Sequence, residues 1–223
     1  MSCVFILVAM RSISRTALRD IALVCVADAI VGASFGAIAV SGGFEPWVPV
    51  VMSLIVFAGG AQFAAIGIVM AGGGAVAAVA TGLVLNARLL PFGFAVADTL
   101  KGRLYGAQLI TDETVAFALK GRDARERHDY FWVSGLALFA AWNVSVVVGA
   151  LAGTFIGDTD ALGLDAMFPA VLLALIMPAL SERGVRVPVL AGGAVALAAS
   201  TVLPAGVPVL LSLLGLLARP KKA

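Results

Sequence analysis

Four groups of polar side chains interrupt the apolar runs of this sequence. They are Asp28 in the first run, Gly59, Gly60 and Gln62 in FAGGAQF, Asn86 and Arg88 in NARLLP, and Thr111, Asp112 and Glu113 in LITDETVAFAL. A lone charge at the centre of a membrane helix costs at least about 2.5 kcal/mol, so such side chains face a cavity or one another. Acids, an arginine and amides together can bind a zwitterionic solute and exchange protons. These residues are therefore the candidate functional residues.

Arg88 carries the most costly group of the set. A guanidinium at membrane depth needs a carboxylate partner, and Asp28, Asp112 and Glu113 are the acids available. Alternatively, Arg88 binds the carboxylate of an amino-acid substrate. A third interpretation ends the apolar span at Leu85 and lets Arg88 reach a lipid headgroup.

The segment FAGGAQF predicts a discontinuous helix. Gly59 and Gly60 each weaken a helix by roughly 1 kcal/mol relative to alanine, and a break there frees backbone groups to line a cavity. Gln62 would add two donors and an acceptor to that cavity. The alternative is that the glycines only allow two helices to touch closely while Gln62 hydrogen-bonds across the contact.

The TDET segment has two interpretations as well. Asp112 and Glu113 can serve a transport site, or Thr111 can cap an ordinary helix whose first turn carries both acids. Trp142, Asn143 and Ser145 are weaker candidates. The single histidine of the chain, His128, stands in a charged segment and is expected to be solvated.

Several functional classes are excluded by what the chain does not contain. It has no Gly-x-Ser-x-Gly motif, no phosphate-binding loop and no Cys/His cluster, so we expect neither an enzyme nor a metal or cofactor site. The net charge of +2 is too small to indicate nucleic-acid binding.

Composition indicates an all-α, polytopic integral membrane protein. The chain of 223 residues is 61% hydrophobic and 13% charged, and its mean hydropathy is +1.07. We expect a single transmembrane domain over 1–223 with seven or eight spans, some of them discontinuous, in the cytoplasmic membrane. The expected spans lie near 20–40, 47–70, 75–97, 104–119, 130–156, 166–180, 187–203 and 207–218.

The basic residues predict the orientation of these spans. The clusters at 11–19, 120–127, 183–186 and 219–222 are expected in the cytoplasm, and Asp158, Asp160 and Asp165 outside. Eight spans put both termini inside, whereas seven result if 104–119 only re-enters the membrane, and the N-terminus then moves outside. Small residues at 32–36 and 149–153 suggest half-repeats over 18–100 and 129–218, or simply close helix packing.

These motifs taken together resemble a known family. GASFGAIAVSGGFEPW, SLIVFAGGAQFAAIG, NARLLPFG and TDET, in this order, are similar to the AzlC-type branched-chain amino acid permeases, the large subunit of a two-component exporter. The resemblance implies export of branched-chain or similar apolar amino acids with a small, multi-spanning AzlD-like membrane partner. It also implies site roles for eight residues that match the family's motifs: Gly59, Gly60, Gln62, Asn86, Arg88, Thr111, Asp112 and Glu113. The proline usual near Asp28 is absent here, so the resemblance implies neither a kink nor a role for Asp28.

Two functions of different class fit the sequence. The first is a secondary transporter, driven by the proton gradient because the chain has titratable acids but no nucleotide-binding motif. The second is a non-transporting membrane scaffold whose polar residues only hold helices together.

Overall fold

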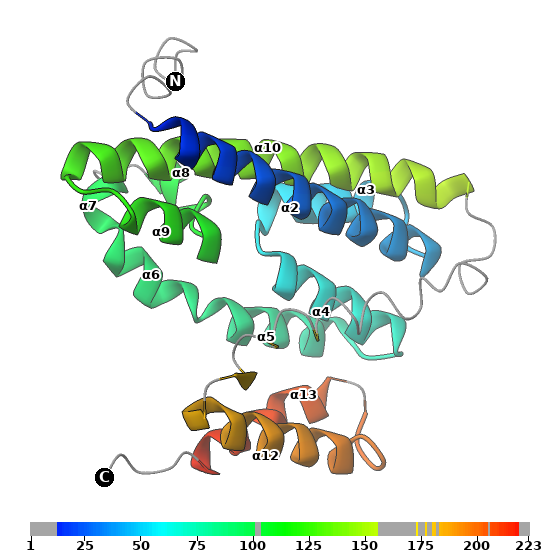
Figure 1. Ribbon diagram of the computed structural model, residues 1–223. Helices are drawn as coiled ribbons and strands as arrows, with labels where there is room; N and C mark the ends of the chain where they lie inside the picture. Colours follow the sequence, from blue (N-terminus) through cyan, green and yellow to red (C-terminus); the bar gives the residue numbers. More distant parts are fainter. Residues whose placement is uncertain are drawn as a thin grey trace. The chain divides into compact units, whose positions relative to one another are not determined.

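The structure is a computed structural model that describes residues 13–100, 104–155, 173, 177, 180–181, 183–204 and 206–218. Within these residues every regular element is a helix, which confirms the all-α prediction (Figure 1). The chain forms two compact units. Unit 1 consists of Met1–Gly59 and Asn86–Gly157, and unit 2 of Gly60–Leu85 and Asp158–Ala223.

Unit 1 is built on two long helices, α2 (Arg15–Ser41) and α10 (Ala124–Phe155), which lie side by side in Figure 1. They are parallel, because Gly32 contacts Ser145 near their middles and Ala37 contacts Gly153 further along both. A Cβ atom added at Gly153 would lie 3.0 Å from the Ala37 carbonyl oxygen. The small residues at 32–36 and 149–153 are therefore the two sides of one close helix contact. The half-repeats themselves stay a prediction.

The third element of unit 1, α3 (Trp47–Ile55), ends halfway along α10. The Ser53 hydroxyl donates to the Asn143 side-chain oxygen at 2.7 Å. After the non-helical residues 56–58 the chain is still at that level, since a Cβ atom at Gly59 would lie 2.9 Å from the Trp142 ring. Helix α4 (Gly59–Met70) begins there. The predicted break is confirmed, and it falls directly before the two glycines.

A side chain from elsewhere in unit 1 supports the break. The Gln108 amide nitrogen donates to the carbonyl oxygens of Leu54 and Ile55 at 3.2 and 2.9 Å. These carbonyls belong to the last turn of α3, where no further helical turn can supply N–H donors. Gln108 therefore satisfies backbone groups that the interruption of the helix sets free.

The third predicted span is present as the apolar helical segment Ala75–Ala95, which two turn residues at 87–88 divide into α5 (Ala75–Asn86) and α6 (Leu89–Ala95). Helix α7 (Ala97–Leu100) follows. The fourth predicted span is not a continuous helix. The region 104–119 holds α8 (Leu104–Ala107) and α9 (Asp112–Leu119). Eight residues of α-helix rise about 12 Å, less than half of a hydrocarbon core. The prediction of one membrane-spanning helix over 104–119 was wrong, because Thr111 starts a new helix there.

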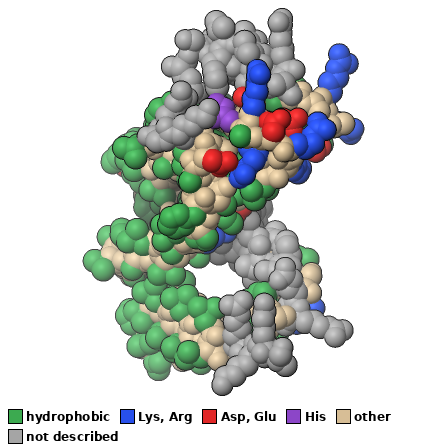
Figure 2. Space-filling view, turned by 90° about the vertical axis from the view of Figure 1, so that its left-hand side faces the viewer, with side chains coloured by type: hydrophobic (Ala, Val, Ile, Leu, Met, Phe, Trp, Pro, Cys, Tyr) green, Lys and Arg blue, Asp and Glu red, His purple; other side chains and the backbone are tan. Residues whose placement is uncertain are grey.

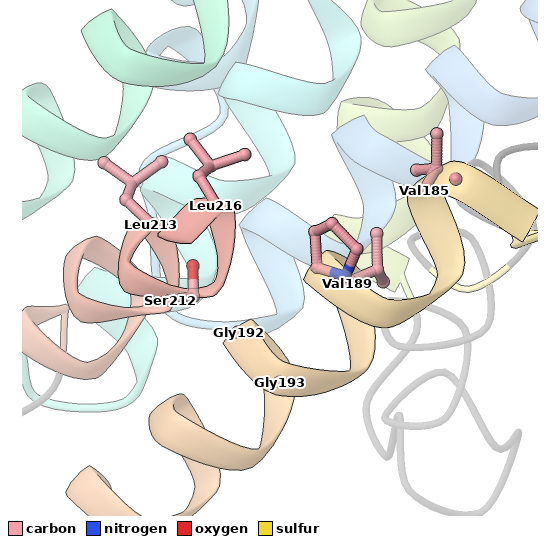
Figure 3. Close-up of a pocket in the computed structure, with 9 residues that line it drawn as sticks. Val185, Val189, Gly192, Gly193, Ser212, Leu213 and Leu216 are labelled. Carbon is pink, nitrogen blue, oxygen red and sulfur yellow. The ribbon is translucent and has the colours of Figure 1, made fainter. Parts of the chain in front are cut away.

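Unit 2 contains a helical hairpin of α4 and α5 and a second group of helices near the C-terminus. Gly72, with φ +82°, lies in the hairpin turn, and a Cβ atom at Gly82 would lie 4.0 Å from Ala61 across the hairpin. The second group is α12 (Arg183–Ala199), α13 (Val207–Leu211) and the 3-10 helix η2 (Ser212–Ala218). A cavity of about 490 Å³ lies between α12 and η2, lined mainly by apolar residues such as Val189 and Leu216 (Figure 3).

Three helical segments of the described residues are long and apolar enough to cross a membrane: Arg15–Ser41, Ala75–Ala95 and Ala124–Phe155. Helix α12 begins and ends four residues before the predicted span at 187–203, and α13 with η2 covers the predicted span at 207–218, but both are shorter than the 18 residues of a candidate membrane span. The predicted span at 166–180 and the loop with Asp158, Asp160 and Asp165 lie outside the described residues, apart from isolated positions. The number of seven or eight spans stays a prediction.

Candidate functional site

Arg88 and Asp112 form an ion pair in unit 1. Arg88 Nη2 lies 3.0 Å from Asp112 Oδ2, and the side chains are 54% and 42% exposed. Arg88 directly precedes α6, in the interruption after α5, and Asp112 is the first residue of α9. Of the three acids that the sequence offered to Arg88, the structure places Asp112 in contact with it.

A capping box holds Asp112 in position. Thr114 N–H donates to the Thr111 side chain at 3.2 Å, and Thr111 N–H donates to the Thr114 hydroxyl oxygen at 2.8 Å. The Thr114 hydroxyl also donates to the Leu109 carbonyl at 2.8 Å, and the residue is fully buried. The helix-start interpretation of TDET is confirmed. A helix cap at Thr111 does not rule out a functional role for Asp112 and Glu113, because the capping box fixes the backbone that carries both acids.

Glu113 follows Asp112 directly on α9, so two adjacent carboxylates stand in the turn that contacts Arg88. Asp28 lies in the middle of α2, also in unit 1. Asn86, the last residue of α5, is half-buried two residues before Arg88. The structure thus brings Arg88 and Asp112 of the predicted site into contact.

The glycine-rich motif is divided between the two units. Gly59 packs against Trp142 in unit 1, whereas Gly60 and Gln62 belong to unit 2. The Gln62 side chain is fully buried, and neither its amide nitrogen nor its oxygen has a hydrogen-bond partner among the described residues. The close packing of Gly59 agrees with the interpretation that the glycines allow two helices to touch. The break before Gly59 agrees with the interpretation of a discontinuous helix. The expected hydrogen bond of Gln62 across a helix contact is not present within the part of the chain that the structure describes.

The prediction for His128, near the N-terminal end of α10, was wrong. His128 is 8% exposed and its Nδ1 atom lies 3.4 Å from Asp129 Oδ1, so it is not the solvated residue that we expected. Helix α10 begins at Ala124, six residues earlier than predicted, and this places His128 on a packed face against Trp132. Figure 2 shows acidic and basic side chains gathered around this histidine.

Arg127 connects the N-terminal end of α10 to α7 by an ion pair and to α6 by a hydrogen bond. Arg127 Nη1 lies 3.5 Å from Asp98 Oδ2, and Nη2 of the same side chain donates to the Ala95 carbonyl at 2.8 Å. Lys120 and Asp20 approach to 3.8 Å at the start of α2. The N-terminal ends of α2 and α10, with their basic residues, therefore lie at the same end of unit 1.

Gln108 and Thr114 are the positioning residues that the sequence analysis missed. Gln108 stands four residues before Asp112 in a segment of low charge, and a polar amide there was the available signal. Thr114 takes the capping-box position where glutamate or glutamine is the usual residue. No group of three or more His, Cys, Asp or Glu side chains in the described part of the chain could hold a metal ion.

A family model described as AzlC protein matches residues 23–156, more than half of the chain. The chain belongs to the AzlC family. Among curated proteins, the AzlC chain is 33% identical to an uncharacterized membrane protein of Archaeoglobus fulgidus over 169 residues, 74% of each chain. It is 30% identical to an uncharacterized membrane protein of Helicobacter pylori over 155 residues, 66% of this chain and 67% of the relative. No solved structure gives a significant match.

The AzlC match has a structural boundary. It ends at residue 156, next to the last residue of α10, and begins within α2. It therefore contains the Arg88–Asp112 pair, the nearby acids and Gln62, whereas α12, α13 and η2 lie beyond it. All the candidate site residues are in the part of the chain that defines the family.

Proposed function

We propose that this AzlC protein is a secondary transporter that exports branched-chain or other apolar amino acids across the cytoplasmic membrane. The observation that carries the proposal is the Arg88–Asp112 ion pair, which stands where a membrane helix is interrupted. Interrupted helices are tolerated at membrane depth where they line a cavity or pack inside the protein. An arginine and acids at such a position favour a role in binding or coupling over simple helix packing.

The acids near Arg88 support coupling to protons. Asp112 and Glu113 are adjacent on α9 beside the single guanidinium of Arg88, and neighbouring carboxylates favour holding a proton. Exchange of that proton with either side of the membrane would link solute movement to the proton gradient. The chain has no nucleotide-binding motif that would supply energy in another way.

The parallel arrangement of α2 and α10 supports a modified topology. If both helices cross in the same direction, the chain between them crosses an odd number of times. The helices of the 104–119 region are too short to cross the membrane. We therefore place a single crossing between α2 and α10, formed by Ala75–Ala95. The Trp47–Met70 segment then enters and leaves on the same side, which agrees with the end of α3 halfway along α10.

A partner subunit is part of the proposal. Membership of the AzlC family, together with the resemblance to two-component exporters, favours a small, multi-spanning AzlD-like membrane protein. Among the described residues, Gly184 and Gly193 on α12 have no neighbour within 4 Å of a built Cβ atom, and both are exposed there. Such surfaces permit close contact with another membrane helix.

Counterflow of labelled leucine into leucine-loaded proteoliposomes tests the proposal. The chain is reconstituted alone and together with a small AzlD-like membrane protein, and the small protein alone serves as background. Uptake that depends on this chain and is abolished by an excess of unlabelled isoleucine supports transport. A chain that is folded and inserted but gives only background uptake in both preparations would be a non-transporting scaffold.

A further inference from the structure

Unit 2 contains a second polar position that the ion pair of unit 1 does not explain. Gln62 on α4 is 0% exposed, and Thr81 on α5 is 1% exposed. The Gln62 amide nitrogen and oxygen and the Thr81 hydroxyl oxygen all lack a hydrogen-bond partner among the described residues. Leaving a buried polar group unpaired destabilises the fold, so three such atoms on two helices of the same hairpin require a physical reason.

The register of the α4–α5 hairpin brings the two residues to the same level. Ala61, next to Gln62, lies opposite Gly82, next to Thr81, with 4.0 Å between Ala61 Cβ and a Cβ atom built at Gly82. Toward the hairpin turn, Gly206 lies against both Ile68 of α4 and Ala77 of α5. Gln62 and Thr81 therefore stand beside the place where the two helices meet, and both are buried.

The surroundings favour an anionic ligand group. Gln62 is the fourth residue of α4, and side chains of a helix lean toward its N-terminus, so the amide points back to the first turn. That turn carries the positive end of the helix dipole and contains no acidic residue. The described residues of the hairpin from 60 to 85 contain no charged side chain. Nothing in the hairpin therefore competes with a carboxylate.

We infer that Gln62 and Thr81 bind the α-carboxylate of the transported amino acid, an inference that rests on the proposed function. Thr81 Oγ1 and Gln62 Nε2 are the donors to the carboxylate, and Gln62 Oε1 accepts from the neighbouring ammonium group. A zwitterion thus satisfies all three atoms. Hydrogen bonds to a charged group are about twice as strong as those between neutral groups, which makes uncharged side chains sufficient. Arg88 is not needed for this contact because it is paired with Asp112.

Ligand-dependent thermal unfolding of the purified chain in detergent tests the site. Three probes divide the substrate chemically: leucine, 4-methylpentanoate, which lacks the ammonium group, and 3-methylbutylamine, which lacks the carboxylate. We expect leucine to raise the unfolding temperature most, 4-methylpentanoate to raise it less, and 3-methylbutylamine to have no effect. An equal shift with 3-methylbutylamine and leucine would overturn the assignment of the carboxylate.

Variants connect the effect to the two side chains. Thr81→Val and Gln62→Met remove the donors with little change of volume, and each should weaken leucine binding by roughly tenfold to a hundredfold. Without ligand, both should unfold at the same temperature as the wild type or higher, because an unpaired buried polar atom is removed. Thr201→Val is the matched control. Its hydroxyl donates to the Ala198 carbonyl at 2.8 Å on an exposed position of unit 2, and leucine binding should not change.

The outcomes separate this inference from the proposed function. If the wild type binds and transports leucine while Thr81→Val and Gln62→Met bind it normally, the inference is wrong and transport stands. A lower unfolding temperature of ligand-free Thr81→Val with normal binding would show a structural hydrogen bond instead. If leucine neither binds nor is transported, the proposed function fails. In that case, 4-methylpentanoate still supports the carboxylate site if it raises the unfolding temperature of the wild type and not that of Thr81→Val. If it does not raise the unfolding temperature of the wild type, the carboxylate site is wrong.

Discussion

Arg88 Nη2 lies 3.0 Å from Asp112 Oδ2, which joins the interruption after α5 to the first residue of α9. The two residues are 24 positions apart in sequence and come from segments that each contain a helix start. Their contact ties the NAR and TDET motifs into one structural feature of unit 1.

This pair should be required for transport more than for folding. Arg88→Ala leaves Asp112 without its partner, and we expect leucine counterflow to fall at least ~10-fold. Arg88→Lys keeps the charge but not the planar guanidinium, and it should lose most of the activity as well. Counterflow is measured at matched amounts of reconstituted protein, and wild-type rates from Arg88→Lys would contradict a binding or coupling role.

The double variant Arg88→Gln/Asp112→Asn separates the two roles. Removing both charges relieves the unpaired carboxylate, so the unfolding temperature should return toward that of the wild type. Transport should stay low. If the double variant transports normally, the ion pair serves packing alone. If neither the unfolding temperature nor transport recovers, Arg88 and Asp112 each have a separate partner.

Gln108 should stabilise the interrupted helix. Gln108→Met removes the donor to the carbonyls of Leu54 and Ile55 while keeping the length of the side chain. We expect a loss of about 0.5–1.5 kcal/mol in the free energy of unfolding. Leu104→Met, at a position that is 89% exposed on the adjacent helix α8, is the control and should change the unfolding temperature little. Equal stability of Gln108→Met and the wild type would exclude this role.

The contact between α2 and α10 should not accept even one methyl group. At Gly36 a Cβ atom would lie 2.6 Å from the backbone nitrogen of Ala150, so the two helices must move apart in Gly36→Ala. We expect the free energy of unfolding to fall by several kcal/mol, on the order of an overpacked core. Gly184→Ala on α12 is the matched control, since its Cβ atom meets open space, and the stability should be unchanged or slightly higher.

Cysteine labelling from the two sides of the membrane tests the topology. In a chain without native cysteines, Glu45→Cys and Ala71→Cys stand on exposed positions before α3 and after α4. We expect an impermeant thiol reagent to label both from outside and Arg125→Cys from inside. Labelling of Glu45→Cys and Ala71→Cys from opposite sides would show that Trp47–Met70 crosses the membrane.

Long uninterrupted helices were predictable from the sequence. The bounds of α2 and α10 follow the apolar runs to within six residues, because an unbroken run of helix-forming apolar residues has no other favourable state in a membrane. The break before Gly59 was predictable too, since paired glycines lower helix propensity locally. Features that depend on local composition, such as long helices and helix breaks, can therefore be predicted from the sequence.

The choice of interaction partners was not predictable in the same way. Three acids were open to Arg88, and only the positions of α6 and α9 in space select Asp112. The burial of His128 depends on where α10 begins and on its packing against Trp132. That the Thr81 hydroxyl has no hydrogen-bond partner among the described residues likewise depends on its local surroundings in the fold. Such relations belong to tertiary structure, and a residue pattern alone does not contain them.

The two helix interruptions have a consequence for motion. Unit 1 passes into unit 2 at Gly59–Gly60 and returns at Leu85–Asn86, and each passage lies within three residues of an interruption, at 56–58 or at 87–88. Rotation about a few backbone dihedrals at these places can reorient one unit without unwinding a helix. The α2–α10 pair, whose backbones touch through glycine, cannot slide or separate in small steps. Alternating exposure of a solute to the two sides of the membrane would then use a fixed frame and two hinges.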